Sequence, residues 1–433
     1  MSRYSRSKSA ACWSAPSRSK TPLSKGDKMT HPAPDTQRRK VLGGIAGGLV
    51  LGLHAANTRA APAGKPIRIG STLSLTGPLA QTALLHRIAG ESYIDIANAG
   101  NGLLGRPVEW VLLDDQSKPE VTRSLYEKLI TSDKVDLVVG PYGTNSILAA
   151  MGVAQRHGKI FIQGSLGIPK LGTYDMQFPA APFGPNPEKD YPLAILDCVQ
   201  SLPSPPKSVT VITSKFPSAQ FMAEGMREAA RQRKLQVPLY LEYEFGTRDF
   251  ASIAARVKDA NADFLWVGAL GVEGNQLLEA LKKLDYAPKL HYYLYPSPGP
   301  LLALPEAKNA LAHTFFEDHP PFSNRDGVPK LSPMYRARAS KAGVQYTQLD
   351  AQATGTYNVF SLLGHAVEAT KSLDDKTLAQ WLKKNTVDGV FGPQSFDGPF
   401  NHGPGRMLTK QVQNGKWVVV WPREVAGAPL VAS

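Results

Sequence analysis

Short apolar runs alternate with amphipathic segments along most of the chain, and turns of small residues follow several of these runs. At residues 67–78 (IRIGSTLSLTGP) a buried strand leads into a turn rich in glycine and hydroxyl residues and then into a helix. Residues 135–146 repeat this arrangement. Parallel strands that end side by side build a crevice of backbone N–H and hydroxyl groups at the carboxyl edge of their sheet. The pattern therefore places function at this edge.

The alternation predicts an α/β fold of two doubly wound, Rossmann-like lobes. Proline crowds residues 178–206, which predicts a crossover with its docking helix between the lobes. In the first lobe we expect strands at 67–73, 108–113, 135–139 and 160–162, with helices at 81–98, 119–129 and 145–156. In the second we expect strands at 209–213, 239–243, 263–267 and 290–294, with helices at 219–233, 250–260 and 275–284.

The C-terminal part predicts a hinged pair of lobes. Two helices, at 351–365 and 377–384, are expected to cover the first lobe, whereas strands 406–412 and 417–421 flank a hairpin signal, Asn414-Gly415, and return to the second. The chain then crosses three times, near 181–186, 314–321 and 391–397, and such a hinge can close on a ligand. We expect lobe 1 at 64–183 and 317–391, and lobe 2 at 184–316 and 392–433.

Charge and the N-terminal segment predict an exported protein. Residues 1–60 hold 11 of the 49 Lys and Arg but two of the 36 acidic residues, so the formal charge of +13 falls to +4 without them, and we expect no nucleic-acid partner. Residues 36–40 (TQRRK), the apolar run 41–53 and Ala61-Pro62-Ala63 form an export signal within residues 1–63, cleaved near 60–63. The arginine pair favours the twin-arginine route, the Sec route stays open, and Met29 is an alternative start. The mature chain then keeps one cysteine, Cys198, interpreted as a small buried residue rather than a reactive thiol.

From residue 67 to about 421 the chain resembles the leucine/isoleucine/valine-binding family of periplasmic receptors of ABC importers, which have the type I fold. The resemblance is carried by LTGPLA at 75–80, IDIANAG and NGLLG at 94–105, DDQS at 114–117, VVGP at 138–141, and DF at 249–250 and 263–264. It implies a periplasmic, monomeric, non-enzymatic receptor without cofactor or metal. Its partners would be a small ligand and the permease and ATPase of the inner membrane. A ligand-sensing receptor for a regulatory partner is the alternative.

Carried over residue by residue, the resemblance implies a ligand site in a cleft between the lobes. Donors near helix N-termini in lobe 1 suit an anion, and Gly164 and Ser165 lie in the segment that helps to hold the ligand carboxylate. The implied site residues are Gln81, Thr82, Tyr142, Gly143, Thr144, Gly164, Ser165, Leu166, Phe216, Ser218, Phe221, Leu270, Gly271, Glu273 and Tyr295.

One departure from the family changes the expected ligand. Amino-acid binders of this family place an acidic residue near Tyr295-Pro296 to pair with the ligand's ammonium group, and this chain has none there. Glu273 is open to two interpretations, a substitute for that acid or an exposed helix-capping residue. The aromatic residues of these loops either pack in the core or contact an aromatic ligand. We therefore expect a carboxylate or amide with an apolar or aromatic body rather than an ordinary zwitterionic amino acid.

Enzyme motifs are incomplete. The glycines of 268–274 do not have dinucleotide-binding spacing, and Gly164-Ser165-Leu166-Gly167 falls one position short of a nucleophile elbow. Zinc motifs of the H-E-x-x-H and C-x-x-C kinds are missing, and His313, His319 and His402 are expected in loops.

Overall fold

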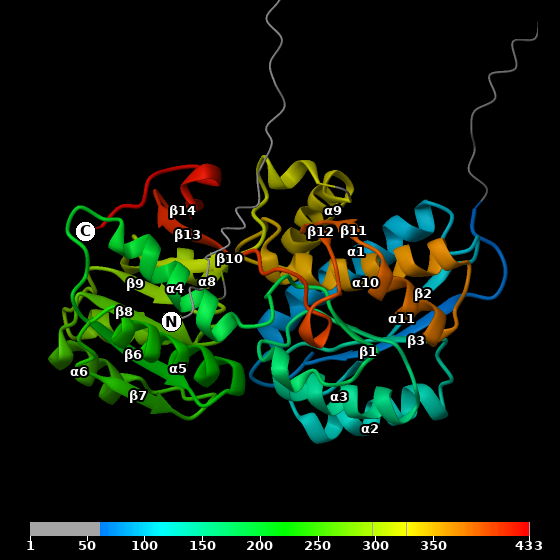
Figure 1. Ribbon diagram of the computed structural model, residues 1–433, viewed down its shortest axis with the longest axis horizontal. Coiled ribbons are helices and arrows are strands. Elements are labelled where there is room, and N and C mark those ends of the chain that lie inside the picture. The colour runs from blue at the N-terminus through cyan, green and yellow to red at the C-terminus, as the bar shows by residue number, and fades with distance from the viewer. Residues whose placement is uncertain (1–60, 297, 326, 433) are drawn as a thin grey trace, which may run out of the picture. The chain divides into compact units, whose positions relative to one another are not determined.

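A computed structural model describes residues 61–296, 298–325 and 327–432 of the protein. The described residues form one compact unit, which is built on two large sheets and their helices (Figure 1). Most of the predicted export signal lies outside the described residues. Within the described part of the chain, no helix combines the length and apolarity needed to cross a membrane.

The first sheet is parallel throughout, with strand order β2-β1-β3-β4-β5. All strands except β2 are largely buried, as is usual where helices cover both faces of a parallel sheet. Its strands are β1 (Ile67–Leu73), β2 (Val108–Asp114), β3 (Leu137–Val139), β4 (Phe161–Gln163) and β5 (Gln177–Pro179). Its helices are α1 (Ala80–Ala99), α2 (Pro119–Thr131), α3 (Thr144–Arg156), α9 (Val328–Lys341), α10 (Ala351–Thr370) and α11 (Asp375–Lys384).

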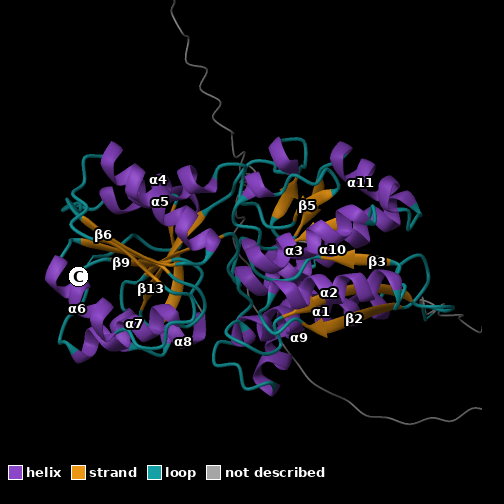
Figure 2. Cartoon of the chain, turned by 90° about the horizontal axis from the view of Figure 1, so that it is seen from below, coloured by secondary structure: helices purple, strands orange, loops and turns teal. Residues whose placement is uncertain are grey.

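The second sheet has the order β14-β13-β10-β9-β8-β6-β7. Its strands are β6 (Val209–Ser214), β7 (Tyr240–Tyr243), β8 (Phe264–Gly268), β9 (His291–Tyr293), β10 (Leu311–Thr314), β13 (Leu408–Gln413) and β14 (Lys416–Trp421). Its helices are α4 (Pro187–Gln200), α5 (Pro217–Gln232), α6 (Ala251–Ala260), α7 (Glu273–Lys283) and α8 (Pro298–Leu302). Figure 2 shows α4 and α5 on one side of these strands and α6 and α7 on the other.

The C-terminal hairpin forms as the sequence predicts. Strands β13 and β14 pair antiparallel, and Asn414 and Gly415 turn between them with φ of 51° and 71°. Strand β13 also pairs with β10, so the hairpin extends the second sheet. A smaller hairpin, β11 (Val387–Gly389) with β12 (Gly392–Gln394), precedes it.

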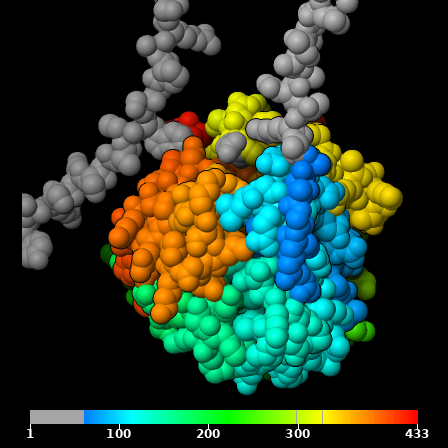
Figure 3. Space-filling view, turned by 90° about the vertical axis from the view of Figure 1, so that its right-hand side faces the viewer, coloured from blue at the N-terminus to red at the C-terminus, as the bar shows by residue number. Residues whose placement is uncertain are grey.

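Helix α10 returns to the first sheet and packs beside α1. A Cβ atom at Gly90 of α1 would lie 2.5 Å from the ring of Trp110 and 3.2 Å from that of Phe360, so only glycine permits this approach. Figure 3 shows the orange C-terminal segment beside the blue and cyan N-terminal part on one face. The predicted cover of the first sheet by the C-terminal helices is therefore present.

The chain passes between the two sheets after β5, after β10 and after β12. These crossings contact one another. The backbone N–H of Arg406 donates to the carbonyl oxygen of Pro182 at 3.0 Å, and Nζ of Lys410 lies 2.6 Å from a carboxylate oxygen of Glu317. The lobe boundaries given above stay predictions.

The sequence pattern did not predict β5, α8, α9, β10, β11 or β12. Strand β5 has three residues at the start of the proline-rich stretch and becomes a strand only by pairing with β4. Helix α9 contains Pro333, which weakens its helical pattern. Cys198 is free and buried, and burial raises the pKa of its thiol to about 12, so its interpretation as a packing residue is confirmed.

Candidate functional site

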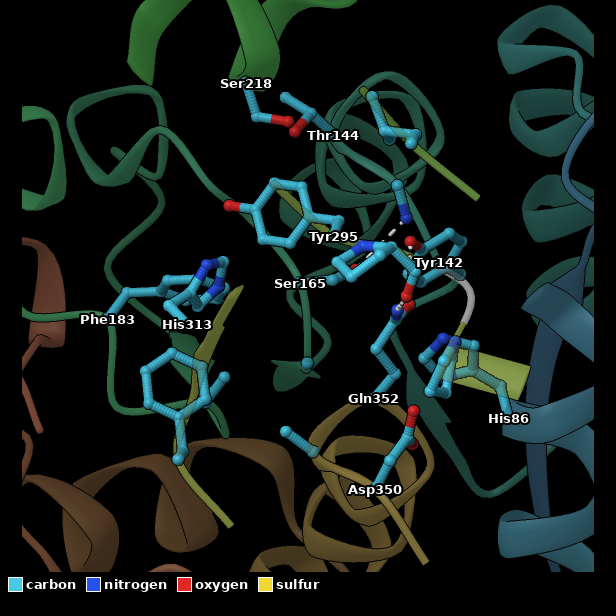
Figure 4. A pocket seen from close by; sticks show the side chains of 18 of the residues that line it. His86, Tyr142, Thr144, Ser165, Phe183, Ser218, Tyr295, His313, Asp350 and Gln352 are labelled. Atoms are coloured by element: carbon cyan, nitrogen blue, oxygen red, sulfur yellow. Dashed lines mark hydrogen bonds between the residues drawn. The ribbon is translucent and has the colours of Figure 1, made fainter. Parts of the chain in front are cut away.

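A cavity lies where the loops that follow parallel strands of both sheets come together (Figure 4). From the first sheet, loops after β3 and β4 reach it, and from the second sheet, loops after β6, β8 and β9. The crossings and the start of α10 close it from the remaining sides. Its lining residues are His86, Tyr142, Gly143, Thr144, Gly164, Ser165, Ala181, Phe183, Phe216, Ser218, Leu270, Tyr295, Pro296, Pro298, His313, Phe315, Asp350, Ala351, Gln352 and Lys410.

One end of the cavity presents hydrogen-bond donors at the start of α3. Gly143 precedes the helix with φ of 88°, and its N–H donates to the hydroxyl of Ser165 at 3.1 Å. Thr144, the first helical residue, is fully buried, and its hydroxyl has no hydrogen-bond partner among the described residues. The first N–H groups of a helix also lack intrahelical partners and carry partial positive charge. This end suits a carboxylate or an amide oxygen.

Aromatic rings form much of the cavity wall. Tyr295 meets His313 edge-on, with ring centroids 5.1 Å apart, and Phe183 meets Phe315 in the same way at 5.2 Å. Phe216 approaches the other lobe, because a Cβ at Gly143 would lie 3.6 Å from its ring. The hydroxyl of Tyr295 is buried without a partner among the described residues. Such a wall suits an apolar or aromatic body with a few polar groups.

A chain of hydrogen bonds links the two sheets beside the cavity. The hydroxyl of Tyr142, after β3, donates to Oε1 of Gln352 at 3.1 Å, and Nε2 of Gln352 donates to the carbonyl oxygen of Pro296, after β9, at 3.1 Å. Gln352 lies in the first turn of α10. Its side chain therefore contacts two segments that precede it in the sequence by 210 and 56 residues.

The cavity wall also contains a buried cluster of charges. Asp350 is the N-cap of α10 and is 3% exposed. Lys410 pairs with Glu317, and these side chains are 6% and 2% exposed. Burial raises the pKa of Asp350 and the negative charge of Glu317 also raises it, whereas Lys410 and the N–H of Ala353 act in the opposite direction.

Two histidines of the wall are neutral at ordinary pH. Burial lowers the pKa of His86 to about 3, and burial together with the charge of Lys410 lowers that of His313 to about 3. Nδ1 of His86 contacts the hydroxyl of Thr356 at 2.6 Å, while its Nε2 has no partner among the described residues. Among the described residues, no group of three or more His, Cys, Asp or Glu could hold a metal ion.

Most of the residues implied by the resemblance line this cavity. They are Tyr142, Gly143, Thr144, Gly164, Ser165, Phe216, Ser218, Leu270 and Tyr295. Gln81 instead lines a second groove with α7, and Thr82 is buried within α1. Leu166 packs in the core of the first sheet, and Gly271 pairs through its backbone with Pro296. Phe221 does not line the cavity: it lies about one turn after Ser218 in α5, and Nζ of Lys170 is 4.5 Å from the centroid of its ring.

Glu273 takes part in the loop before α7 and does not line the cavity. It is 5% exposed, so its interpretation as an exposed capping residue is wrong. Its carboxylate accepts hydrogen bonds from the N–H groups of Leu270 and Gly246 at 3.2 and 3.0 Å, and from the hydroxyl of Tyr243 at 3.4 Å. These partners hold it in place, and burial raises its pKa.

Several wall residues could not be found from local sequence signals. Four of them come from segments that carry no turn motif of the predicted kind: His86, Asp350, Gln352 and Lys410. In addition, two histidines that were expected in loops are buried. His313 belongs to β10 rather than to a loop, and His402 is 1% exposed. The one available signal was Asp350 before a helical run, which marks an N-cap.

Comparisons with known proteins agree with this geometry. The model of the family described as periplasmic binding protein matches residues 66–416. The Leu/Ile/Val-binding protein of Escherichia coli K12 is 22% identical over 334 residues, which are 76% of this chain and 86% of that protein. An amino acid binding protein of Pseudomonas aeruginosa is 21% identical over 308 residues, 69% of this chain and 78% of that protein.

Solved structures share the fold. A solute-binding protein of an ABC transporter from R. palustris, in complex with benzoate, has a TM-score of 0.69 at 17% identity and covers 85% of this chain and 98% of its own. A branched-chain amino acid transporter substrate-binding protein from Streptococcus pneumoniae, in complex with isoleucine, has a TM-score of 0.68 at 21% identity. The match covers 85% of this chain and 100% of that protein. The predicted type I fold of two α/β lobes is thereby confirmed.

Proposed function

The chain belongs to the periplasmic binding protein family, and from this premise we propose that it is the receptor of an ABC importer that binds a small carboxylate or amide with an apolar or aromatic body. The family is one of binding proteins, so the chain needs no catalytic step. The receptor closes on its ligand between the two sheets and delivers it to the permease and ATPase of the inner membrane.

The observation that carries the proposal is the buried hydroxyl of Thr144, to which no described residue forms a hydrogen bond. A buried polar group normally has a hydrogen-bond partner, and leaving one unsatisfied costs about 1–3 kcal/mol. Its position at the first turn of α3, beside Gly143 and Ser165, supports an anionic oxygen as the missing partner.

The wall supports the rest of the ligand class. Solved relatives bind benzoate in one case and isoleucine in another. In this chain, Phe183, Tyr295 and Phe315 line the cavity, and no acidic residue follows β9, where amino-acid binders of the resembling family place one. Aromatic or branched aliphatic acids therefore fit this wall better than a zwitterionic amino acid.

We further propose that residues 1–63 direct export and that the mature receptor acts in the periplasm as a monomer. The arginine pair at 38–39 supports the twin-arginine route. Replacing both arginines by lysine tests the route, because it is expected to block twin-arginine export and to spare export by Sec.

The ligand class is tested by titration calorimetry of the mature receptor with benzoate, isoleucine and leucine, after native mass spectrometry for a co-purified molecule. We expect benzoate or a related acid to bind with a dissociation constant in the micromolar range or below. Binding of leucine and isoleucine, with no binding of any acid that lacks an ammonium group, would overturn the proposed ligand class.

A further inference from the structure

Asp350 lies at the opposite end of the cavity from the α3 donors. Figure 4 shows its carboxylate below Gln352, with His86 to the right and Thr144 at the other end of the view. One of its oxygens accepts the N–H of Ala353 at 2.9 Å, which caps α10. No side chain in the described part of the chain donates a hydrogen bond to either oxygen. The carboxylate is thus buried with only backbone donors.

Within the described part of the chain, no cation pairs with Asp350 alone. Lys410 acts on Asp350 electrostatically, but its Nζ forms an ion pair with Glu317 at 2.6 Å. One ammonium group therefore serves two buried carboxylates. His86 and His313 add no positive charge, since burial keeps both neutral. A buried charge without full compensation is costly.

Helix capping alone does not explain an aspartate at this position. Asparagine and serine cap helices about as well as aspartate, and neither would bring a charge into an apolar cavity. The chain also contains the same cap in an exposed place, because Asp374 caps α11 by accepting the N–H of Thr377 at 2.9 Å. Asp350, by contrast, is 3% exposed and belongs to the cavity wall.

A second group at this end also lacks a partner. Nε2 of His86 is buried, lines the cavity and has no hydrogen bond among the described residues. Each end of the cavity therefore has a polar group without a hydrogen-bond partner among the described residues, Thr144 at one end and His86 at the other. The aromatic wall lies between them. A ligand that satisfies both ends has a carboxylate at one end and a hydrogen-bond donor at the other.

We infer that Asp350 is a specificity-determining residue that accepts a hydrogen bond from a hydroxyl or ammonium group on the far end of the bound acid. The inference rests on the proposed function and names its ligand more closely. It also supplies, from the start of α10, the acidic group that is missing after β9.

The experiment compares pairs of acids that differ only in the donor. Titration calorimetry measures benzoate against 4-hydroxybenzoate and 4-(aminomethyl)benzoate, and phenylacetate against 4-hydroxyphenylacetate, on the wild-type receptor and on Asp350→Asn. We expect at least one donor-bearing acid to bind about tenfold more tightly than its parent to the wild type, as for a hydrogen bond to a charged group. In Asp350→Asn this ratio is expected to fall to about one, since the remaining amide oxygen is occupied by the cap. The preferred donor, hydroxyl or ammonium, identifies the ligand's far end.

Asp374→Asn is the matched control, because it makes the same change at an exposed cap and is expected to keep the wild-type ratio. Thermal unfolding of both variants shows that the caps persist. Equal binding of parent and donor-bearing acids to the wild type, or an unchanged preference in Asp350→Asn, would overturn the inference and leave the proposed function intact. Binding of none of these acids would overturn the inference together with the aromatic part of the proposed ligand class.

Discussion

The side-chain amide of Gln352 donates a hydrogen bond to the carbonyl oxygen of Pro296 at 3.1 Å. Gln352 lies in the first turn of α10, which covers the first sheet, whereas Pro296 follows β9 of the second. The same amide accepts from Tyr142, so one side chain is held by groups of both sheets. The link lies in the cavity wall, where a closing movement would make or break it.

Gln352→Ala is expected to weaken the closed, ligand-bound form. A neutral hydrogen bond contributes about 0.5–1.5 kcal/mol, so ligand dissociation should become roughly 2- to 10-fold faster. Stopped-flow fluorescence of the loaded receptor measures this rate. Gln348→Ala, at an exposed position outside the cavity, is the control and should dissociate at the wild-type rate.

Thr144→Val should separate stability from binding. Valine keeps the shape of threonine but removes a buried hydroxyl that has no partner among the described residues, so the unfolding midpoint should stay the same or rise. Affinity for benzoate should fall about tenfold, because a hydrogen bond to the carboxylate is lost. Thr144→Ser keeps the hydroxyl and should bind nearly as the wild type does. Equal affinity of the valine and serine variants would contradict a carboxylate at this end.

The sequence predicts the parts of fold and site that depend on local patterns. Tyr142, Thr144 and Ser165 follow strands whose apolar runs and small-residue turns are visible in the chain, and the structure places all three at the cavity. Gln352 and Lys410 reach the same cavity through long-range packing, which no local pattern encodes. Tyr142 and its partner Gln352 are 210 residues apart. Short strands such as β5 are missed for the same reason, because pairing creates them.

Lys410→Met should destabilise the receptor strongly. It leaves the carboxylates of Glu317 and Asp350 buried without a cation, and breaking a buried ion pair in this way costs about 3–5 kcal/mol. Urea unfolding at pH 7 measures the loss. Adding Glu317→Gln removes one of the two uncompensated charges and should restore a large part of the stability. A double variant no more stable than Lys410→Met would show that the pair does not act through charge.

Stability should decrease as the pH falls from about 6.5 towards 4. Burial lowers the pKa of His291 from 6.5 to about 4, so in this interval the unfolded chain binds a proton that the folded protein does not. The linkage amounts to roughly 2.5 kcal/mol at pH 4.5. His291→Gln should reduce the pH dependence by this amount in urea unfolding at pH 7.5 and 4.5. Between pH 7.5 and 8.5 neither state of His291 binds a proton, so both proteins should behave alike there.

Phe216 lies in the cavity wall, whereas Phe221 lies on α5 outside the cavity. Both are aromatic residues of the loop and helix that follow β6, and the sequence offers no reason to choose between them. Phe216 is 4% exposed and lines the cavity, whereas Phe221 packs under Lys170 outside it. Phe216→Ala should therefore lower the affinity for benzoate about tenfold, because a buried apolar contact is lost. Phe221→Ala should leave the affinity within twofold of the wild type. The reverse order in calorimetry would place the ligand further along α5 than the cavity does.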